Sequence, residues 1–144
     1  MLKNALPLVS LLLPMTLLAA PLTPLPNFQA ARDAINQGQR LHVVINFEQC
    51  TPAQPVSATF TPTAVMYFQQ RIVFSDNHLT LNEPDAPGTP IREIVSYTYS
   101  NDAKGLGQLT IQSTNLYAAT LKKLDKQPPT ITCELATGGF KLFS

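Results

Sequence analysis

The chain has 144 residues, of which 44% are hydrophobic and 13% charged, and ten Lys and Arg residues against nine Asp and Glu residues leave a formal charge of +1. A nucleic-acid-binding protein needs a basic surface, and a disordered protein combines low hydrophobicity with high net charge, so both classes are excluded. Two cysteines are too few for a disulfide-dense miniprotein or a four-thiolate zinc site. The length is that of one ordinary domain.

Residues 1–19 have the pattern of a signal peptide. Lys3 provides a positive start, and an uncharged, largely apolar stretch extends over residues 6–20. This stretch is shorter than the roughly 20 apolar residues of a membrane-spanning helix, and it ends in the small residues Ala19 and Ala20, as a signal-peptidase site does. We place the cleavage after Ala19, because cleavage one residue later would leave a proline first. An uncleaved N-terminal anchor is the alternative.

Cleavage would change the charge balance of the protein. Lys3 would leave with the signal peptide, so that nine basic residues face nine acidic ones. Because the signal peptide would be removed, we expect a periplasmic or secreted protein without a stable membrane anchor. Its neutral charge gives no field that would attract nucleic acid or an anionic membrane surface.

A Pro-rich leader is predicted next, over residues 20–26, because prolines favour an extended segment rather than a structured element. A single β-rich domain is predicted over residues 27–144. Its first element is a helix over residues 27–37, in which Asn27 suits the N-cap and Gly38 suits the position just past the end.

Beyond this helix the hydrophobic pattern changes to a period of two residues, which is typical of half-buried strands. Seven or eight short strands are predicted, over residues 41–48, 64–68, 72–74, 78–81, 91–100, 109–113, 130–135 and 140–143. Residues 51–63 predict a loop, since they are rich in Pro, Thr and Ser, and residues 75–77 predict a turn. Residues 115–124 fit either a helix or a strand.

The order of these elements indicates the fold class. Strands without alternating helices argue against a parallel sheet. We predict a mainly β fold, either a small antiparallel β-sandwich or a partly closed barrel, with one N-terminal helix.

The two cysteines, Cys50 and Cys133, predict a structural disulfide. An isolated pair in an exported domain most simply forms one bond, and here it would join the first predicted strand to the penultimate one. The spacing excludes a C-x-x-C redox motif. Free buried thiols, or a reactive or metal-binding cysteine, are the alternatives.

Three polar residues form a possible functional cluster: Asp76, His78 and His42. Asp76 and His78 would point to the same face of a strand, and with His42 they would offer three metal ligands or part of a hydrolytic site. The competing interpretation is that Asp76 caps a turn and orients His78 through a hydrogen bond. The sequence has no G-x-S-x-G nucleophile motif and implies no cofactor.

Several segments in order resemble the VirK family of small exported bacterial proteins. They are Gly38 with the strand that leads to Cys50, then residues 60–64, residues 72–78, and the late strand through Cys133 with its Gly-Phe ending. One departure is the hairpin at residues 69–71, which lacks an Asp-Gly turn. The resemblance implies an exported protein linked to host interaction or virulence, and it implies no catalytic residues.

These observations together favour a non-enzymatic, exported β-domain that binds a protein or another envelope or host partner. A small-ligand carrier with an apolar interior is the first alternative. A metal-dependent hydrolase that uses Asp76 and His78 is the second and weaker one.

Overall fold

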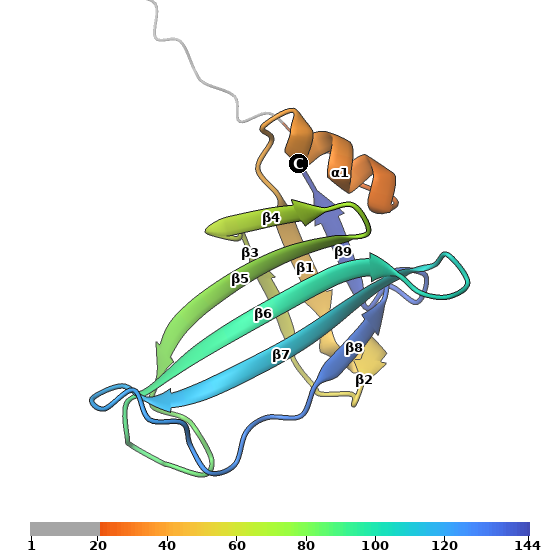
Figure 1. The fold of residues 1–144 in the computed structure, drawn as a ribbon. Helices are drawn as coiled ribbons and strands as arrows, with labels where there is room; N and C mark the ends of the chain where they lie inside the picture. The colour runs from red at the N-terminus through yellow and green to blue at the C-terminus, as the bar shows by residue number, and fades with distance from the viewer. Residues whose placement is uncertain (1–20) are drawn as a thin grey trace, which may run out of the picture.

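The computed structural model describes residues 21–144, so the predicted signal peptide lies outside the described residues (Figure 1). It contains one α-helix, one short 3₁₀ helix (η1) and nine strands. In chain order they are α1 (Phe28–Asn36), β1 (His42–Asn46), η1 (Phe47–Gln49), β2 (Cys50–Thr51), β3 (Ser57–Phe60), β4 (Ala64–Phe68), β5 (Arg71–Thr80), β6 (Ile91–Asn101), β7 (Gly107–Tyr117), β8 (Ile131–Glu134) and β9 (Phe140–Phe143).

The strands form two antiparallel sheets. The smaller sheet has the order β3-β1-β9, and the larger one has the order β2-β8-β7-β6-β5-β4. The chain passes between the sheets four times, between β1 and β2, β2 and β3, β3 and β4, and β8 and β9. The first and last of these passages lie side by side, because β1 pairs with β9 and β2 pairs with β8, and they make a shared corner. The sheets do not close into a barrel, because β3 and β4 are edge strands of different sheets. The predicted fold class, mainly β with one N-terminal helix, is confirmed.

The core lies between the two sheets and continues beneath α1 (Figure 1). The inward positions of the long strands are in register, so that Ile72, Tyr99 and Leu109 form one buried row and Phe74, Tyr97 and Ile111 form the next. This is the alternation that the sequence predicts for residues 91–100. The two rows give the large sheet an apolar inner face in the second half of β6 and the first half of β7.

The predicted helix and its N-cap are confirmed. The side chain of Asn27 accepts a hydrogen bond of 2.9 Å from the backbone N–H of Ala30. The buried face of α1 presents Phe28, Ala31 and Ala34 to the core, and the ring of Phe28 packs edge-on against Tyr99 with 5.3 Å between ring centroids. The helix therefore covers the sheet at the end where β6 finishes.

The prediction of a loop over residues 51–63 is wrong in part, because it contains β3. This strand pairs with β1 through four residues, and Phe60 packs its ring 4.8 Å from that of Tyr97. Flanking prolines, serines and threonines hide the short strand in the sequence. Its stability comes from pairing and core contacts with distant residues, which outweigh local preference.

The prediction of a turn at residues 75–77 is also wrong, since these residues lie inside the ten-residue strand β5. All three pair with β6, with Ser75 opposite Ser96 and Asn77 opposite Ile94. The side chain of Asp76 does accept a hydrogen bond from the N–H of Asn77, at 2.8 Å. Local turn chemistry is thus present, but the long ladder with β6 determines the backbone.

Residues 115–124, for which helix and strand were both open, divide between a strand and a turn. β7 continues to Tyr117, and the chain then turns so that Lys123 forms an isolated bridge with Leu116. Farther along, Cys50 in β2 and Cys133 in β8 lie directly opposite each other and form the predicted disulfide, with 4.3 Å between their Cα atoms. Cys50 lies just beyond the first strand rather than in it.

The Pro-rich leader was predicted to be an extended segment rather than a structured element, but its described part, residues 21–26, pairs with the fold. The N–H of Leu25 donates to the carbonyl of Leu142 at 2.8 Å, and Thr23 and Ser144 exchange two backbone hydrogen bonds. Leu25 is buried in the core. The leader therefore covers the free edge of β9.

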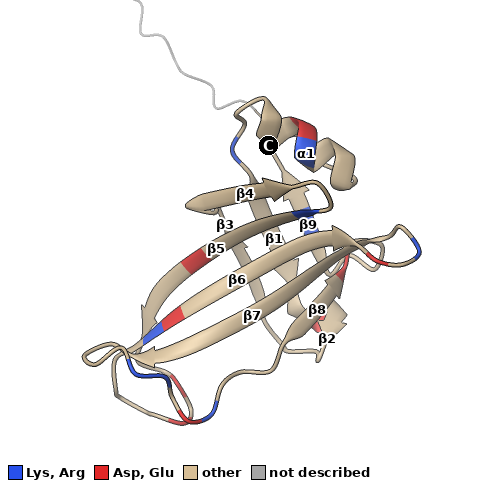
Figure 2. Cartoon of the chain, in the orientation of Figure 1, with Lys and Arg blue, Asp and Glu red and all other residues tan. Residues whose placement is uncertain are grey.

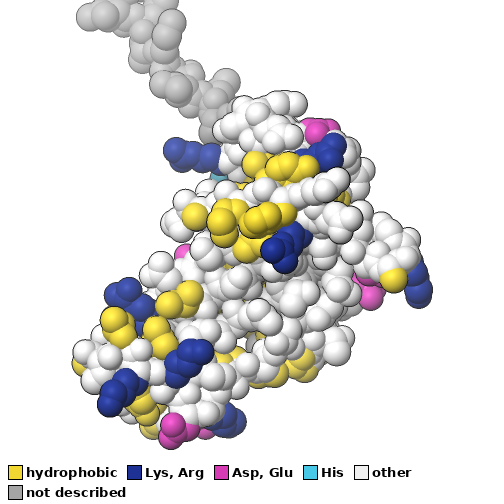
Figure 3. Space-filling model, viewed as in Figure 1, with side chains coloured by type: hydrophobic (Ala, Val, Ile, Leu, Met, Phe, Trp, Pro, Cys, Tyr) yellow, Lys and Arg dark blue, Asp and Glu magenta, His cyan; other side chains and the backbone are white. Residues whose placement is uncertain are grey.

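The outer face of the large sheet carries an exposed apolar pair on its edge strand β4. Figure 3 shows apolar side chains gathered over this strand, where Met66 and Phe68 are exposed. The guanidinium of Arg71 lies 4.7 Å from the centre of the Phe68 ring and covers one of its faces. None of the helices within residues 21–144 is long and apolar enough to cross a membrane.

Candidate functional site

A row of polar side chains crosses the inner face of the large sheet near one end of its long strands. His78 on β5 lies opposite Glu93 on β6, and Glu93 lies opposite Asn115 on β7. All three occupy positions with the same parity as the buried residues Phe74 and Tyr97, so they face the space between the sheets. The strand pattern that builds the core thus places polar groups between the main core and a smaller buried cluster of Ala86, Ile91 and Leu124.

This row lies in a cleft of about 570 Å³, which we call the polar cleft. Its apolar walls come from both sheets and from the adjoining loops, through Phe47, Val56, Ala58, Pro84, Val95, Tyr97, Ile111, Pro128, Pro129 and Ile131. Its polar groups are Gln54, His78, Glu83, Asp85, Glu93, Ser113, Asn115, Lys126 and Gln127. Charged residues of both signs gather at this end of the molecule, as Figure 2 shows for the start of β6 and the loops below it.

Both basic groups of the polar cleft are paired with carboxylates. His78 Nε2 lies 3.0 Å from Glu93 Oε2, and Lys126 Nζ lies 3.1 Å from Asp85 Oδ1. The side chains of His78 and Glu93 are 52% and 24% exposed, so this pair lies at the mouth of the cleft. The third carboxylate of the lining, Glu83, has no ion pair within the described part of the chain. The cleft therefore has a surplus of negative charge.

Asn115 is the most deeply placed polar group of the cleft, with 2% of its surface exposed. Its side-chain Nδ2 donates to Glu83 Oε2 at 2.6 Å. Its backbone is held by Gln127, whose Oε1 accepts from the Asn115 N–H at 2.8 Å and whose Nε2 donates to the Asn115 carbonyl at 3.1 Å. The side-chain oxygen Oδ1 of Asn115 is buried and has no hydrogen-bond partner among residues 21–144.

Tyr97 forms the inner wall of the polar cleft. Burial raises the pKa of its phenol above the ordinary value, and the nearby carboxylates of Asp76 and Glu93 raise it further. The hydroxyl is therefore protonated and neutral at physiological pH. An acidic cleft with a neutral phenol is suited to binding through hydrogen bonds and charge.

The structure separates the three residues of the predicted cluster. His78 lines the polar cleft, and Asp76 lies two residues earlier on the same face of β5. His42 lies on β1 between the inward-facing residues Leu41 and Val43, so it faces away from the space between the sheets. Its Nδ1 is 2.9 Å from the hydroxyl of Thr61. In the part of the chain that the structure describes, no group of three His, Cys, Asp or Glu side chains is placed to hold a metal ion.

Several residues of the polar cleft were not singled out from the sequence. Glu93 did leave a signal, since it is the one charged residue at the alternating positions 91, 93, 95, 97 and 99, whose other residues are apolar or aromatic. Asn115 begins the segment 115–124, which fits either a helix or a strand in the sequence. Glu83 and Gln127 lie in loops and reach Asn115 from 32 and 12 positions away. No local pattern identifies such loop contacts.

The fold and the cleft define a mainly β domain in which two sheets, joined at a disulfide-bonded corner, hold an acidic cleft between them. The model of the VirK protein family matches residues 24–120, which is more than half of the chain, so the protein belongs to the VirK family.

The crystal structure of a VirK family protein from Legionella pneumophila is similar to this fold, with a TM-score of 0.70 and 32% sequence identity. The match covers 85% of this chain and 99% of the Legionella chain. A search of curated proteins found no match. The family resemblance inferred from the sequence is thereby confirmed.

Proposed function

We propose that this VirK family protein is an exported, non-enzymatic binding domain that acts in virulence, in the periplasm or after secretion, and holds a partner at the polar cleft. The signal-peptide pattern of residues 1–19 supports export, and membership of the VirK family supports the link to virulence. The disulfide between Cys50 and Cys133 suits an oxidising compartment.

The observation that carries the proposal is the unsatisfied oxygen of Asn115. Leaving a buried polar atom without a partner costs about 1–3 kcal/mol, so such an atom calls for a ligand or an ordered water. Asn115 Oδ1 lies in a side chain already bonded to Glu83, and both residues line the polar cleft. The two side chains together offer acceptors and a negative charge to an incoming group.

The complementary group is a hydrogen-bond donor that carries positive charge. The ammonium of a lysine side chain and the guanidinium of an arginine side chain have only donors, and both have an apolar stem that suits the walls of the cleft. We therefore propose a partner protein that inserts one basic side chain. The acidic lining repels phosphate, so nucleic acid is not a partner in this proposal.

The test compares Glu83→Gln with Glu134→Gln. Glu134 is an exposed residue of β8 outside the lining of the cleft, so its substitution removes the same charge from another place. N-acetyl-lysinamide and N-acetyl-argininamide are titrated into the protein, and the side-chain amide signals of Asn115 and Gln127 are followed by NMR. We expect saturable shifts that weaken about tenfold in Glu83→Gln and are unchanged in Glu134→Gln.

The same two variants extend the test to a macromolecular partner. Pull-downs from envelope and host-cell extracts are followed by zero-length carboxylate–amine crosslinking. A partner lysine crosslinked to Glu83, and lost in Glu83→Gln, is the expected result. Basic probes that shift neither amide, together with crosslinks confined to other carboxylates, would contradict the proposal.

A small-ligand carrier is the second candidate, and the size of the cleft favours it. A volume of about 570 Å³ lies within the range of small-molecule sites, and much of the lining is apolar. Native mass spectrometry of the freshly purified protein distinguishes the two functions. A carrier is expected to retain a ligand mass, whereas a domain that binds a partner protein is expected to give the mass of the polypeptide alone.

A further inference from the structure

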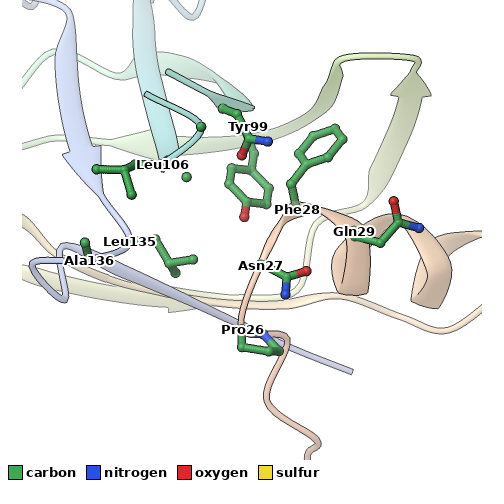
Figure 4. A pocket seen from close by; sticks show the side chains of 11 residues that line it. Pro26, Asn27, Phe28, Gln29, Tyr99, Leu106, Leu135 and Ala136 are labelled. Atoms are coloured by element: carbon green, nitrogen blue, oxygen red, sulfur yellow. The ribbon is translucent and has the colours of Figure 1, made fainter. Parts of the chain in front are cut away.

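A second pocket lies at the opposite end of the long strands, where β6 ends and β7 begins. It has a volume of about 560 Å³, and we call it the helix-cap pocket because the first turn of α1 forms one side of it (Figure 4). Its apolar lining is Pro26, Phe28, Leu106, Leu135 and Ala136. Its polar side chains are those of Asn27, Gln29, Tyr99 and Asn101, so no charged side chain from the described part of the chain lines it.

Tyr99 supplies the polar atom of this pocket that has no partner. The residue is 0% exposed, and its hydroxyl has no hydrogen-bond partner within residues 21–144. Figure 4 shows this hydroxyl directed into the pocket, between Phe28 on the helix side and Leu135 on the other wall. The ring is fixed by edge-on contacts to Phe28 and Phe140, at 5.3 and 5.2 Å between centroids. The hydroxyl is therefore held in place while it lacks a partner.

Gly107 lets the backbone at the start of β7 pass closely beside this hydroxyl. A Cβ atom at this position would lie 3.0 Å from Tyr99 Oη and 3.2 Å from Leu135 Cβ. Any larger residue would press on the hydroxyl and on the wall of the pocket. The absence of a side chain here thus allows Tyr99 to keep the position in which its hydroxyl points into the pocket.

The helix contributes further donors to the same pocket. The N–H groups in the first turn of a helix have no acceptor within the helix, and the aligned peptide dipoles place a partial positive charge there. Asn27 caps the N–H of Ala30, which leaves the earlier N–H groups of Phe28 and Gln29 to other acceptors. A helix start and a fixed hydroxyl donor together favour an oxygen that carries negative charge.

We propose that the helix-cap pocket binds a carboxylate attached to an apolar or aromatic group. The carboxylate accepts from the Tyr99 hydroxyl and from the first turn of α1, and the apolar group lies against Leu106, Leu135 and Ala136. The lining has no carboxylate that would repel such a ligand. This site is separate from the polar cleft and takes a ligand of the opposite charge.

The test uses phenylacetate as the probe and phenylacetamide as its neutral counterpart, with the purified exported protein. Binding is followed by NMR through the backbone amides of Phe28, Gln29 and Gly107. We expect saturable shifts with phenylacetate, at the weak affinity normal for so small a ligand, and clearly weaker binding of phenylacetamide. Equal binding of the two probes would overturn the assignment of a carboxylate.

Two variants separate the role of the hydroxyl from general packing. Tyr99→Phe retains the ring and its contacts, and it is expected to weaken phenylacetate binding about 10- to 100-fold, as for a hydrogen bond to a charged group. Tyr97→Phe is the matched control, since Tyr97 lines the polar cleft instead, and its affinity for phenylacetate should equal that of the unmodified protein. Unchanged binding in Tyr99→Phe, or no amide shift at saturating probe concentration, would overturn the proposal.

Discussion

The two ends of strands β6 and β7 have opposite chemistry, although the same ladder of paired residues builds both. At one end the polar cleft contains three carboxylates and two bases; at the other the helix-cap pocket has no charged side chain. Each end nevertheless holds one buried polar atom that finds no partner among the described residues 21–144, Asn115 Oδ1 and Tyr99 Oη respectively. The fold therefore sacrifices some stability at two places, and these are the places where it has open space.

The same register of strands β5, β6 and β7 places both the core residues and the polar groups of the cleft on the inner face of the sheet. In the middle of the strands, the rows that contain Tyr97 and Tyr99 are closed by aromatic and aliphatic neighbours and form the core. Toward the start of β6 the same inward positions hold Glu93 and its partners. Strand pairing fixes the geometry along the whole length, and side-chain identity decides where the main core gives way to the polar cleft.

Removing the disulfide is expected to have the largest effect, and it acts on both ends together. The bond closes a loop of 83 positions at the corner that joins the sheets. The double variant Cys50→Ala, Cys133→Ala should lose about 4 kcal/mol of unfolding free energy in the chain-entropy model. Urea denaturation measures the loss, and hydrogen exchange should increase at both ends of β6. A loss below 1 kcal/mol, or loosening at one end only, would contradict this view of the corner.

A charge introduced at Asn115, the deep polar group of the polar cleft, should lower the stability much more than a charge introduced at the other end of the same strands. Asn115→Asp places a second carboxylate beside Glu83, where repulsion and burial disfavour ionisation. We expect a loss of roughly 3 kcal/mol at pH 7, as for an unpaired buried charge. Repulsion raises the pKa of the pair in the folded state, so the loss should shrink as the pH falls toward the ordinary carboxyl pKa near 4.

The control for this variant is Asn101→Asp, at the other end of the same ladder. Asn101 is exposed, so its ionised form remains hydrated and the change should cost little. Urea denaturation of both variants at pH 7 and pH 4 gives the comparison. An equal loss in the two variants, or a loss in Asn115→Asp that does not change with pH, would show that Asn115 and Glu83 do not act as a buried pair.

Alkaline pH tests the end with the helix-cap pocket. Burial raises the pKa of Tyr99 to about 12 from the ordinary value of 10.0. Below pH 10 the Tyr99 phenol is protonated in both the folded and the unfolded state. Above pH 10 the unfolded state loses this proton first, so the folding stability falls as the pH rises from 10 to 12. Between pH 8 and pH 11, Tyr99→Phe should therefore lose about 1 kcal/mol less unfolding free energy than the unmodified protein does. Parallel denaturation curves at pH 8 and pH 11 measure this, and an identical pH dependence would refute it.

The smallest effect is expected at the mouth of the polar cleft. The ion pair of His78 and Glu93 is half exposed on the histidine side, and such pairs contribute between zero and about 1 kcal/mol. His78→Ala should therefore change stability by less than about 0.5 kcal/mol, with the difference further reduced at high salt. A thermal denaturation series at low and high salt provides the measurement. A loss above 2 kcal/mol would assign His78 a structural role.

The parts of the fold that could be predicted from the sequence are those that local patterns encode. The helix with its Asn27 cap, the alternation of β6 and the disulfide all follow from spacing or from residue type. β3 and the centre of β5 were missed because their flanking or internal residues favour turns, whereas pairing with distant strands stabilises them. Tertiary contacts outweighed propensity at both places.

The polar cleft was predictable only in part, and for the same reason. His78 was singled out, and its neighbour across the ladder, Glu93, stands out in an apolar strand face. The bonds that define the deep part of the cleft join Asn115 to Glu83 and Gln127, which lie on two different loops. The loop with Glu83 connects β5 to β6, and the loop with Gln127 connects β7 to β8. The pairing of these strands brings the two loops into contact, and no local sequence pattern predicts that contact.

The covered edge of β9 has a consequence for the order in which the protein can fold as it emerges from synthesis or translocation. Residues 23–25 and β1 come early in the chain, yet both need β9, near the far end of the chain, as a hydrogen-bonded neighbour. An emerging chain can form the β5-β6-β7 meander early, while its first segment remains without that partner. The small sheet, and with it the cleft between the sheets, is completed only when β9 arrives.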